Sequence, residues 1–107
     1  MRQESLARLY IQNNFNEDKK MKFNGNFILK KIGDTFYAVP LGSISKEIKG
    51  MIKLNNTAAF IWQKIEDGIS SEEIVNTLSN EFKTDKATAQ KDFDEFTSAL
   101  KEAKILV

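Results

Sequence analysis

The chain has 107 residues, which is enough for one domain with one hydrophobic core. Its 16 basic residues nearly balance its 15 acidic residues, so the net charge of +1 does not demand nucleic acid, an anionic membrane or a polyanionic substrate. The sequence has no cysteine, which excludes disulfides, thiolate metal sites and a catalytic thiol, and no histidine, the commonest metal ligand and general base. It also lacks a membrane-length apolar run and the apolar core of a signal peptide, so we expect a cytosolic protein.

Residues 1–20 differ in composition from the rest of the chain. They are polar, carry scattered apolar residues and end in a charged run of Glu17, Asp18, Lys19 and Lys20. We expect a polar N-terminal appendage, either loosely ordered or partly helical over about Gln3–Asn13, with apolar residues that dock on the domain or on a partner. The domain itself is then expected to span residues 21–107.

Three short segments after the appendage predict a β-sheet. Phe27–Ile32 and Thr35–Pro40 are rich in β-branched and aromatic residues and are separated by Gly33-Asp34, which predicts a hairpin with a type II′ turn. Pro40 cannot donate to a ladder, so we expect it to limit the second strand. Gly50–Leu54 is short and apolar, and we expect it to form a third strand at a sheet edge.

The segment after the third strand predicts a short helix that the rest of the domain packs around. Asn55 or Asn56 can cap its N-terminus, and Gly68 offers a left-handed stop. Five apolar residues share one side of this helix, so Trp62, the only tryptophan, should lie in the core between the elements before and after it. These residues are Leu54, Ala58, Ile61, Trp62 and Ile65.

Two further helices are predicted toward the C-terminus. Ser70 with Glu73 forms a capping-box pattern and Ile69 with Ile74 a hydrophobic staple, so the second helix should begin at Ser71. A polar run from Lys83 to Lys86 separates it from the third. The expected apolar faces are Ile74, Val75, Leu78 and Phe82 on the second helix, and Ala89, Phe93, Phe96 and Leu100 on the third. Strands followed by three helices predict an α+β fold in which the last two helices are related as in a helix-turn-helix.

At these residues the chain resembles the PqqD-like family, whose fold is the RiPP recognition element, a winged-helix-like domain with a three-stranded antiparallel sheet followed by three helices. The resemblance covers about residues 27–106, departs from the family at Lys104, where a glycine is common, and has no counterpart for residues 1–20. The matching residues are Leu54, Asn55, Thr57 and Ala58, then Ile61-Trp62 and Asp67-Gly68, the Ser70–Glu73 cap, Asp92-Phe93 with Phe96 and Leu100, and Ile105-Leu106.

The resemblance implies a non-catalytic peptide chaperone without a cofactor. Such a protein binds the leader of a ribosomally synthesised precursor peptide and presents it to a modifying enzyme, usually a radical S-adenosylmethionine enzyme. In the family, the leader adds as a strand beside the third strand and lies against the third helix, which uses the physics of strand addition at a free sheet edge. The corresponding residues here are Ile48, Lys49, Gly50, Met51, Ile52 and Lys53 on the strand side, and Ala87, Gln90, Lys91, Asp94, Thr97 and Lys101 on the exposed flank of the third helix.

Two other classes of function fit the sequence less well. Carboxylate clusters at Glu66-Asp67, Glu72-Glu73 and Asp92-Asp94-Glu95 could in principle support acid–base chemistry or a metal. They lie at expected helix ends or among lysines, where solvation and the helix dipole explain them. A small winged-helix DNA-binding regulator is the main alternative, with the third helix as reader and the Gly33-Asp34 hairpin as wing. Its reader helix is mixed in sign, because Asp92, Asp94 and Glu95 follow Lys91 closely and would repel phosphates.

Overall fold

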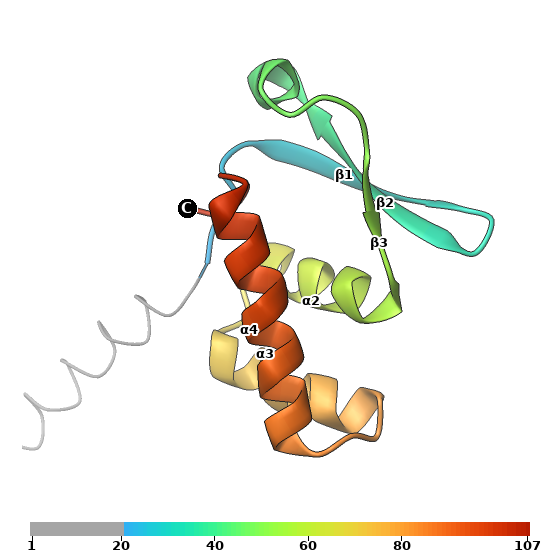
Figure 1. Ribbon diagram of the computed structural model, residues 1–107, viewed down its shortest axis with the longest axis vertical. Helices are drawn as coiled ribbons and strands as arrows, with labels where there is room; N and C mark the ends of the chain where they lie inside the picture. Colours follow the sequence, from blue (N-terminus) through green and yellow to red (C-terminus); the bar gives the residue numbers. More distant parts are fainter. Residues whose placement is uncertain (1–20) are drawn as a thin grey trace, which may run out of the picture.

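The computed structural model describes residues 21–107, which open with a three-stranded antiparallel sheet. Its strands are β1 (Asn26–Ile32), β2 (Thr35–Leu41) and β3 (Ile52–Leu54), in the order β1-β2-β3 (Figure 1). Both β1 and β3 are therefore edge strands of the described sheet. A short 3-10 helix, η1 (Gly42–Lys46), lies within the connection from β2 to β3, where no helix was predicted.

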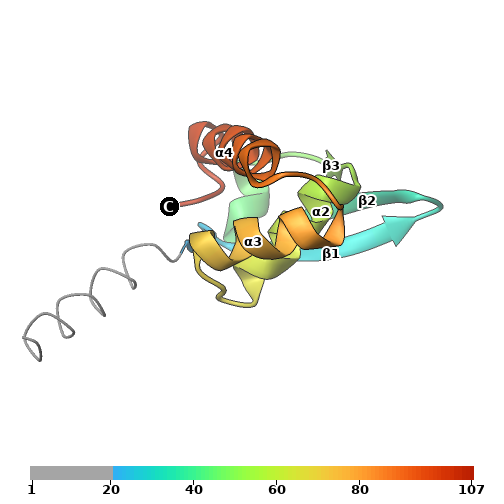
Figure 2. The ribbon, with the colours of Figure 1, turned by 90° about the horizontal axis from the view of Figure 1, so that it is seen from below.

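Three α-helices follow the sheet: α2 (Asn56–Glu66), α3 (Ser71–Glu81) and α4 (Lys86–Glu102). They lie on one side of the sheet in Figure 1, and Figure 2 shows α4 with β3 on one side of α2 and α3 with β1 on the other. This arrangement confirms the predicted α+β fold of three strands followed by three helices. Between residues 21 and 107, no helix combines the length and the apolar character needed to span a bilayer.

The β1–β2 hairpin has the predicted turn but a longer second strand than expected. Gly33 has φ of 65°, whereas Asp34 is not among the described residues with positive φ, which is the pattern of a type II′ turn. The prediction that Pro40 limits the strand is wrong, because β2 continues to Leu41 with Pro40 opposite Phe27. β3 pairs only with residues 36–38, so no described strand pairs with β2 on that side at Pro40, where a missing N–H is tolerated.

The third strand is shorter than predicted. It begins at Ile52 rather than Gly50, and it pairs Ile52, Lys53 and Leu54 with β2. Gly50 has φ of 83°, a left-handed conformation that belongs to a turn and not to a strand. Met51 therefore lies between this turn and the paired strand.

Local signals for the helix ends are confirmed. Asn55, not Asn56, caps α2 by accepting a hydrogen bond from the Ala58 N–H at 2.8 Å, and the Ser70 hydroxyl accepts one from the Glu73 N–H at the start of α3. Helix α2 ends at Glu66, and Gly68 follows its C-cap with φ of 79°, the expected left-handed stop. At the start of α4 the cap is Asp85, and hydrogen bonds from the Thr88 hydroxyl and N–H hold the pKa of Asp85 below its ordinary value.

The core lies between the inner face of the sheet and the three helices. Trp62 and Ile61 are completely buried there, with Ala38 of β2 and Leu54 of β3, so the predicted central role of Trp62 is confirmed. The core side chains are Ala38, Leu54, Ala59, Ile61, Trp62, Ile65, Ile74, Val75, Leu78, Ala89, Phe93, Leu100, Ile105 and Leu106. Two residues predicted on apolar helix faces are less covered: Phe96 is half-buried, and Phe82 is 40% exposed.

Candidate functional site

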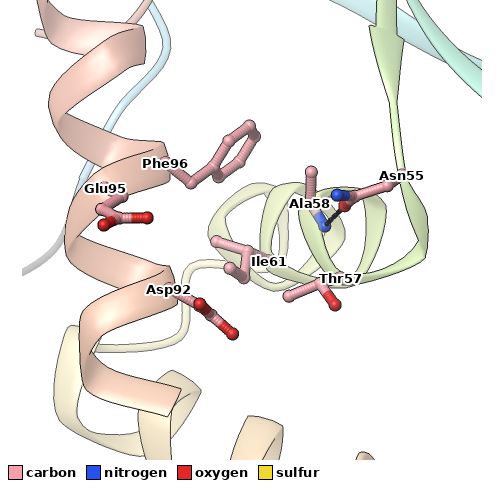
Figure 3. A pocket seen from close by; sticks show the side chains of 7 residues that line it. All are labelled: Asn55, Thr57, Ala58, Ile61, Asp92, Glu95 and Phe96. Atoms are coloured by element: carbon pink, nitrogen blue, oxygen red, sulfur yellow. Dashed lines mark hydrogen bonds between the residues drawn. The ribbon is translucent and has the colours of Figure 1, made fainter. Parts of the chain in front are cut away.

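A cleft of about 320 Å³ opens between α2 and α4, beside the end of β3. We call it the α2–α4 cleft and show its lining in Figure 3. Ala58 and Ile61 of α2 face Phe96 of α4 across it, so apolar side chains form its walls. The lining residues are Asn55, Thr57, Ala58, Ile61, Asp92, Glu95 and Phe96.

Helical periodicity explains how α4 forms its wall of the cleft. On α4, Asp92, Glu95 and Phe96 are spaced by three and one residues, which places them on one face of the helix. This face borders the buried stripe of Ala89, Phe93 and Leu100 that anchors α4 to the core. The packing of that stripe therefore fixes the direction in which Phe96 points.

The cleft combines an apolar floor with an acidic rim. Ile61 is completely buried and Phe96 half-buried, whereas Glu95 is exposed and Asp92 is partly exposed. Across from these carboxylates, Thr57 and Asn55 are polar and uncharged, and the Asn55 side chain is engaged as the α2 cap. In residues 21–107, no three Asp or Glu side chains gather closely enough to hold a metal ion. The cleft can thus take an apolar side chain and attract a basic or hydrogen-bonding group at its mouth.

β3 presents a free edge next to this cleft. The sheet order leaves one side of β3 without a neighbouring strand among the described residues, and β3 leads directly into Asn55 and α2. Along the segment predicted to bind a peptide, Lys49, Gly50, Met51 and Lys53 are exposed, and Ile48 and Ile52 are partly buried against the core. Of these six predicted residues, Ile52 and Lys53 lie in β3 itself, and the other four lie in the segment that leads into it.

The predicted residues on α4 lie elsewhere around the helix. Ala87, Gln90, Lys91, Asp94 and Lys101 are exposed, but none of them lines the α2–α4 cleft. Gln90 and Asp92 differ by about 200° around an α-helix, because each residue turns it by about 100°. Gln90 instead donates a hydrogen bond to Asp94 at 2.9 Å along the other flank of the helix.

The placement of Thr97 on an exposed flank is wrong. Thr97 is 5% exposed, and its hydroxyl donates to the carbonyl oxygens of Phe93 and Asp94 at 2.9 and 3.3 Å. A threonine can bury its hydroxyl in a helix in this way because the preceding turn supplies an acceptor. Thr97 is therefore not available to contact a peptide.

Sequence reasoning missed most of the cleft. Asp92 and Glu95 were interpreted as solvated charges, and Phe96 and Ala58 were assigned to apolar core faces. One pattern could have identified them: Asp92, Glu95 and Phe96 combine two carboxylates and an aromatic ring at helical spacing beside a buried stripe. Such a mixed flank is typical of a boundary between core and surface.

Comparisons with known proteins agree with this geometry. The family model described as coenzyme PQQ synthesis protein D (PqqD) matches residues 41–106, which include β3 and all three helices. Among solved structures, TbiB1 in complex with the TbiA(beta) leader peptide is similar, with a TM-score of 0.64 and 25% sequence identity over 79% of this chain and 93% of that chain. No curated protein matches the chain. The family match thus includes both walls of the α2–α4 cleft and the strand beside it.

Proposed function

Because the chain belongs to the PqqD family, as its resemblance predicted, we propose that it is a non-catalytic peptide chaperone. It binds the leader of a ribosomally synthesised precursor peptide by strand addition at β3 and presents that peptide to a modifying enzyme, a radical S-adenosylmethionine enzyme, in the cytosol. The observation that carries this proposal is the free edge of β3 beside the apolar α2–α4 cleft. The similar structure of TbiB1, which is a complex with a leader peptide, supports the same class of ligand.

Strand addition divides the recognition of the leader between its backbone and its side chains. The N–H and C=O groups on the side of β3 that no described strand pairs supply hydrogen bonds that do not depend on the leader's sequence. Specificity comes from alternate side chains, because successive residues of a strand point to opposite faces. One such side chain enters the α2–α4 cleft between Ala58 and Phe96, so we expect the leader to carry an apolar residue there.

Charge around the cleft adds a second element of specificity. Asp92 and Glu95 lie on the α4 side of the cleft, whereas Lys53 lies in β3 and Lys49 in the segment before it. The two carboxylates favour a leader with a basic residue beside its apolar anchor. The two lysines favour acidic residues along the added strand. The chain itself has neither histidine nor cysteine, so we assign the chemistry to the enzyme that receives the peptide.

A steric test separates the cleft from the rest of the surface. Ala58→Leu fills the α2–α4 cleft without touching the strand edge, and we expect it to weaken binding of a fluorescently labelled leader by roughly tenfold, the loss of one buried side chain. The search for that leader begins with any short peptide encoded beside this gene. Anisotropy titration of the full chain gives the affinity, and circular dichroism checks the fold.

Gln63→Leu is the matched control, because Gln63 is exposed on another side of the same helix and lines no part of the α2–α4 cleft. It should bind the leader as the parent does. Equal affinity in the parent and in folded Ala58→Leu would show that the leader does not enter this cleft.

A further inference from the structure

A second cleft, of about 390 Å³, lies on the other side of α2. We call it the α2–α3 cleft. It opens between the inner face of the β1–β2 hairpin, α2 and the end of α3, and four of its seven lining residues are leucine or phenylalanine. Its lining consists of Leu29, Phe36, Asn56, Ala59, Phe60, Gln63 and Phe82.

The exposed aromatic side chains make this cleft unusual for a surface. Phe82 follows the last residue of α3 and is 40% exposed, and its ring meets that of Phe60 edge-on with centroids 5.6 Å apart. Phe60 and Phe36 are only partly buried. Contiguous, partly exposed rings of this kind mark interaction sites more often than lone apolar residues do.

Helix α2 separates the two clefts. Its residues Thr57, Ala58 and Ile61 line the α2–α4 cleft, whereas Phe60 and Gln63 line the α2–α3 cleft. Ala58 and Phe60 are about 200° apart around the helix, so the clefts face away from each other. A ligand in one cleft therefore leaves the other open, and the two can be occupied together.

The two clefts differ in charge. The α2–α4 cleft is lined by Asp92 and Glu95, whereas no charged residue between 21 and 107 lines the α2–α3 cleft. Two lysines instead stand over its rings: the Lys31 Nζ atom is 5.4 Å from the Phe36 ring centroid, and the Lys64 Nζ atom is 5.2 Å from that of Phe60. Next to Phe82, Glu81 and Lys83 offset each other. The rim of the α2–α3 cleft is therefore basic.

The basic rim of the α2–α3 cleft decides which of three candidates fits it: a second copy of the chain, residues 1–20 or a segment of another protein. A second copy of the chain joined through the same surface would bring lysines against lysines, because a two-fold interface pairs a patch with itself. Residues 1–20 carry four basic and three acidic residues, so they offer no net negative charge. An acidic segment with apolar or aromatic side chains satisfies both the rings and the lysines.

We propose that the α2–α3 cleft docks an acidic, apolar segment of the enzyme that receives the peptide. The identity of that partner rests on the proposed function, because a chaperone that presents a peptide must hold its peptide and the enzyme at the same time. The acidic and apolar character of the segment rests on the cleft alone. The α2–α4 cleft then holds the leader, and the α2–α3 cleft holds the enzyme.

Chemical-shift mapping on the ¹⁵N-labelled full chain tests the proposal. The probes are a capped synthetic peptide of alternating glutamate with leucine and phenylalanine, and the same peptide with lysine in place of each glutamate. We expect the glutamate peptide to shift the amide signals of Phe60, Gln63 and Phe82, both without leader and with leader at saturation. The lysine peptide should bind at least roughly fivefold more weakly, as reversed pairing with two partly exposed lysines predicts.

Variants of the chain complete the test. The double variant Lys31→Glu with Lys64→Glu should weaken binding of the glutamate peptide by a similar factor. Phe82→Ser should weaken binding of both peptides. Lys22→Glu with Lys46→Glu makes the same charge change at exposed residues outside the α2–α3 cleft and should leave binding unchanged. A receiving enzyme, once purified, should lose affinity for the Lys31/Lys64 variant while the labelled leader binds it as before.

Several results would overturn the proposal. Equal binding of the two peptides would show that the α2–α3 cleft does not select an acidic segment. Chemical-shift changes confined to β3 and α4 would show that the peptide does not bind in this cleft. A concentration-dependent dimer in sedimentation that Phe82→Ser abolishes would assign the cleft to a second copy. Stronger binding of the glutamate peptide after Leu6, Leu9 and Tyr10 are replaced by serine would assign it to residues 1–20. If only leader binding fails, the proposed function is overturned, but the α2–α3 cleft remains a docking site for an acidic segment.

Discussion

Phe23 stacks on Trp62, with ring centroids 4.3 Å apart and an angle of 27° between the rings. Phe27 meets the same indole edge-on at 5.2 Å, and the indole Nε1–H donates to Glu66 at 3.3 Å. The segment just before β1 is thus joined to the centre of the core. It is also joined to the C-terminus, because the Asn24 N–H donates to the Ile105 carbonyl oxygen and Phe23 bridges to Leu106.

Replacement of Trp62 by alanine should destabilise the domain severely. The indole is completely buried, so its removal leaves a cavity that costs about 3 to 5 kcal/mol. This is a large part of the roughly 5 to 15 kcal/mol that stabilise a typical domain. Urea denaturation followed by circular dichroism measures the change, and Trp62→Phe, which keeps a ring against Phe23, should lose less. A melting temperature within a degree or two of the parent in Trp62→Ala would contradict the central role of this residue.

Deletion of residues 1–20 should leave the stability of the domain nearly unchanged. The remaining chain starts at Met21 and keeps Phe23 and every described strand and helix. Deletion of residues 1–24 should be clearly destabilising, because it removes the ring stacked on Trp62 and the bridge to Leu106. Thermal melting of the two deletion variants measures the difference. A large loss in the shorter deletion would place the domain boundary before residue 21.

Lys104→Gly should stabilise the domain by about 0.5 to 1 kcal/mol. Lys104 follows α4 with φ of 63°, and the Ile105 N–H donates back to the Leu100 carbonyl oxygen at 2.8 Å, so the turn is a left-handed helix stop built on a lysine. Glycine removes the left-handed strain of about 1 to 2 kcal/mol, partly offset by its greater freedom in the unfolded chain. Urea denaturation measures the gain. Lys104→Ala keeps the strain and should show none, and an equal gain in both variants would mean that φ is not the cause.

Helix caps and turns were the part of the fold that the sequence predicted best. Caps at Asn55 and Ser70 and the turn at Gly33 depend on residues within a few positions of one another, so their sequence is sufficient to identify them. The start of β3 was placed two residues too early because it depends on where β2 pairs and where Gly50 turns. These are tertiary constraints that a short apolar run does not carry.

The side of α4 that borders the α2–α4 cleft could not be predicted from the sequence either. Spacing identified the buried stripe of Ala89, Phe93 and Leu100, but polar residues flank that stripe on both sides. Only the packing of α4 beside α2 decides that Asp92 and Glu95, and not Gln90 and Asp94, border the cleft. The exposure of Phe82 was missed because Phe82 continues the spacing of the buried α3 residues in sequence but lies just past the end of the helix, where the core covers it less.

Proline substitution at the edge of β3 tests strand addition directly. Side-chain mutation cannot remove a backbone donor, whereas Met51→Pro and Ile52→Pro each delete one N–H group. Successive N–H groups point to opposite sides of a strand, so one of these donors faces β2 and the other faces the incoming leader. We expect one variant to lose leader binding with a modest loss of stability. The other should mainly weaken the pairing of Ile52–Leu54 with β2.

Titration of labelled leader into each variant, with circular dichroism and thermal melting as checks of the fold, distinguishes the two effects. Lys91→Glu on α4 gives a separate reading of charge, since Lys91 is exposed but does not line the α2–α4 cleft. This variant should bind an acidic leader more weakly at low salt, and the loss of affinity should shrink as the salt concentration rises. Unchanged leader affinity in both folded proline variants would exclude strand addition at β3. The α2–α4 cleft would then have to bind the leader through side chains alone, which Ala58→Leu would still reveal.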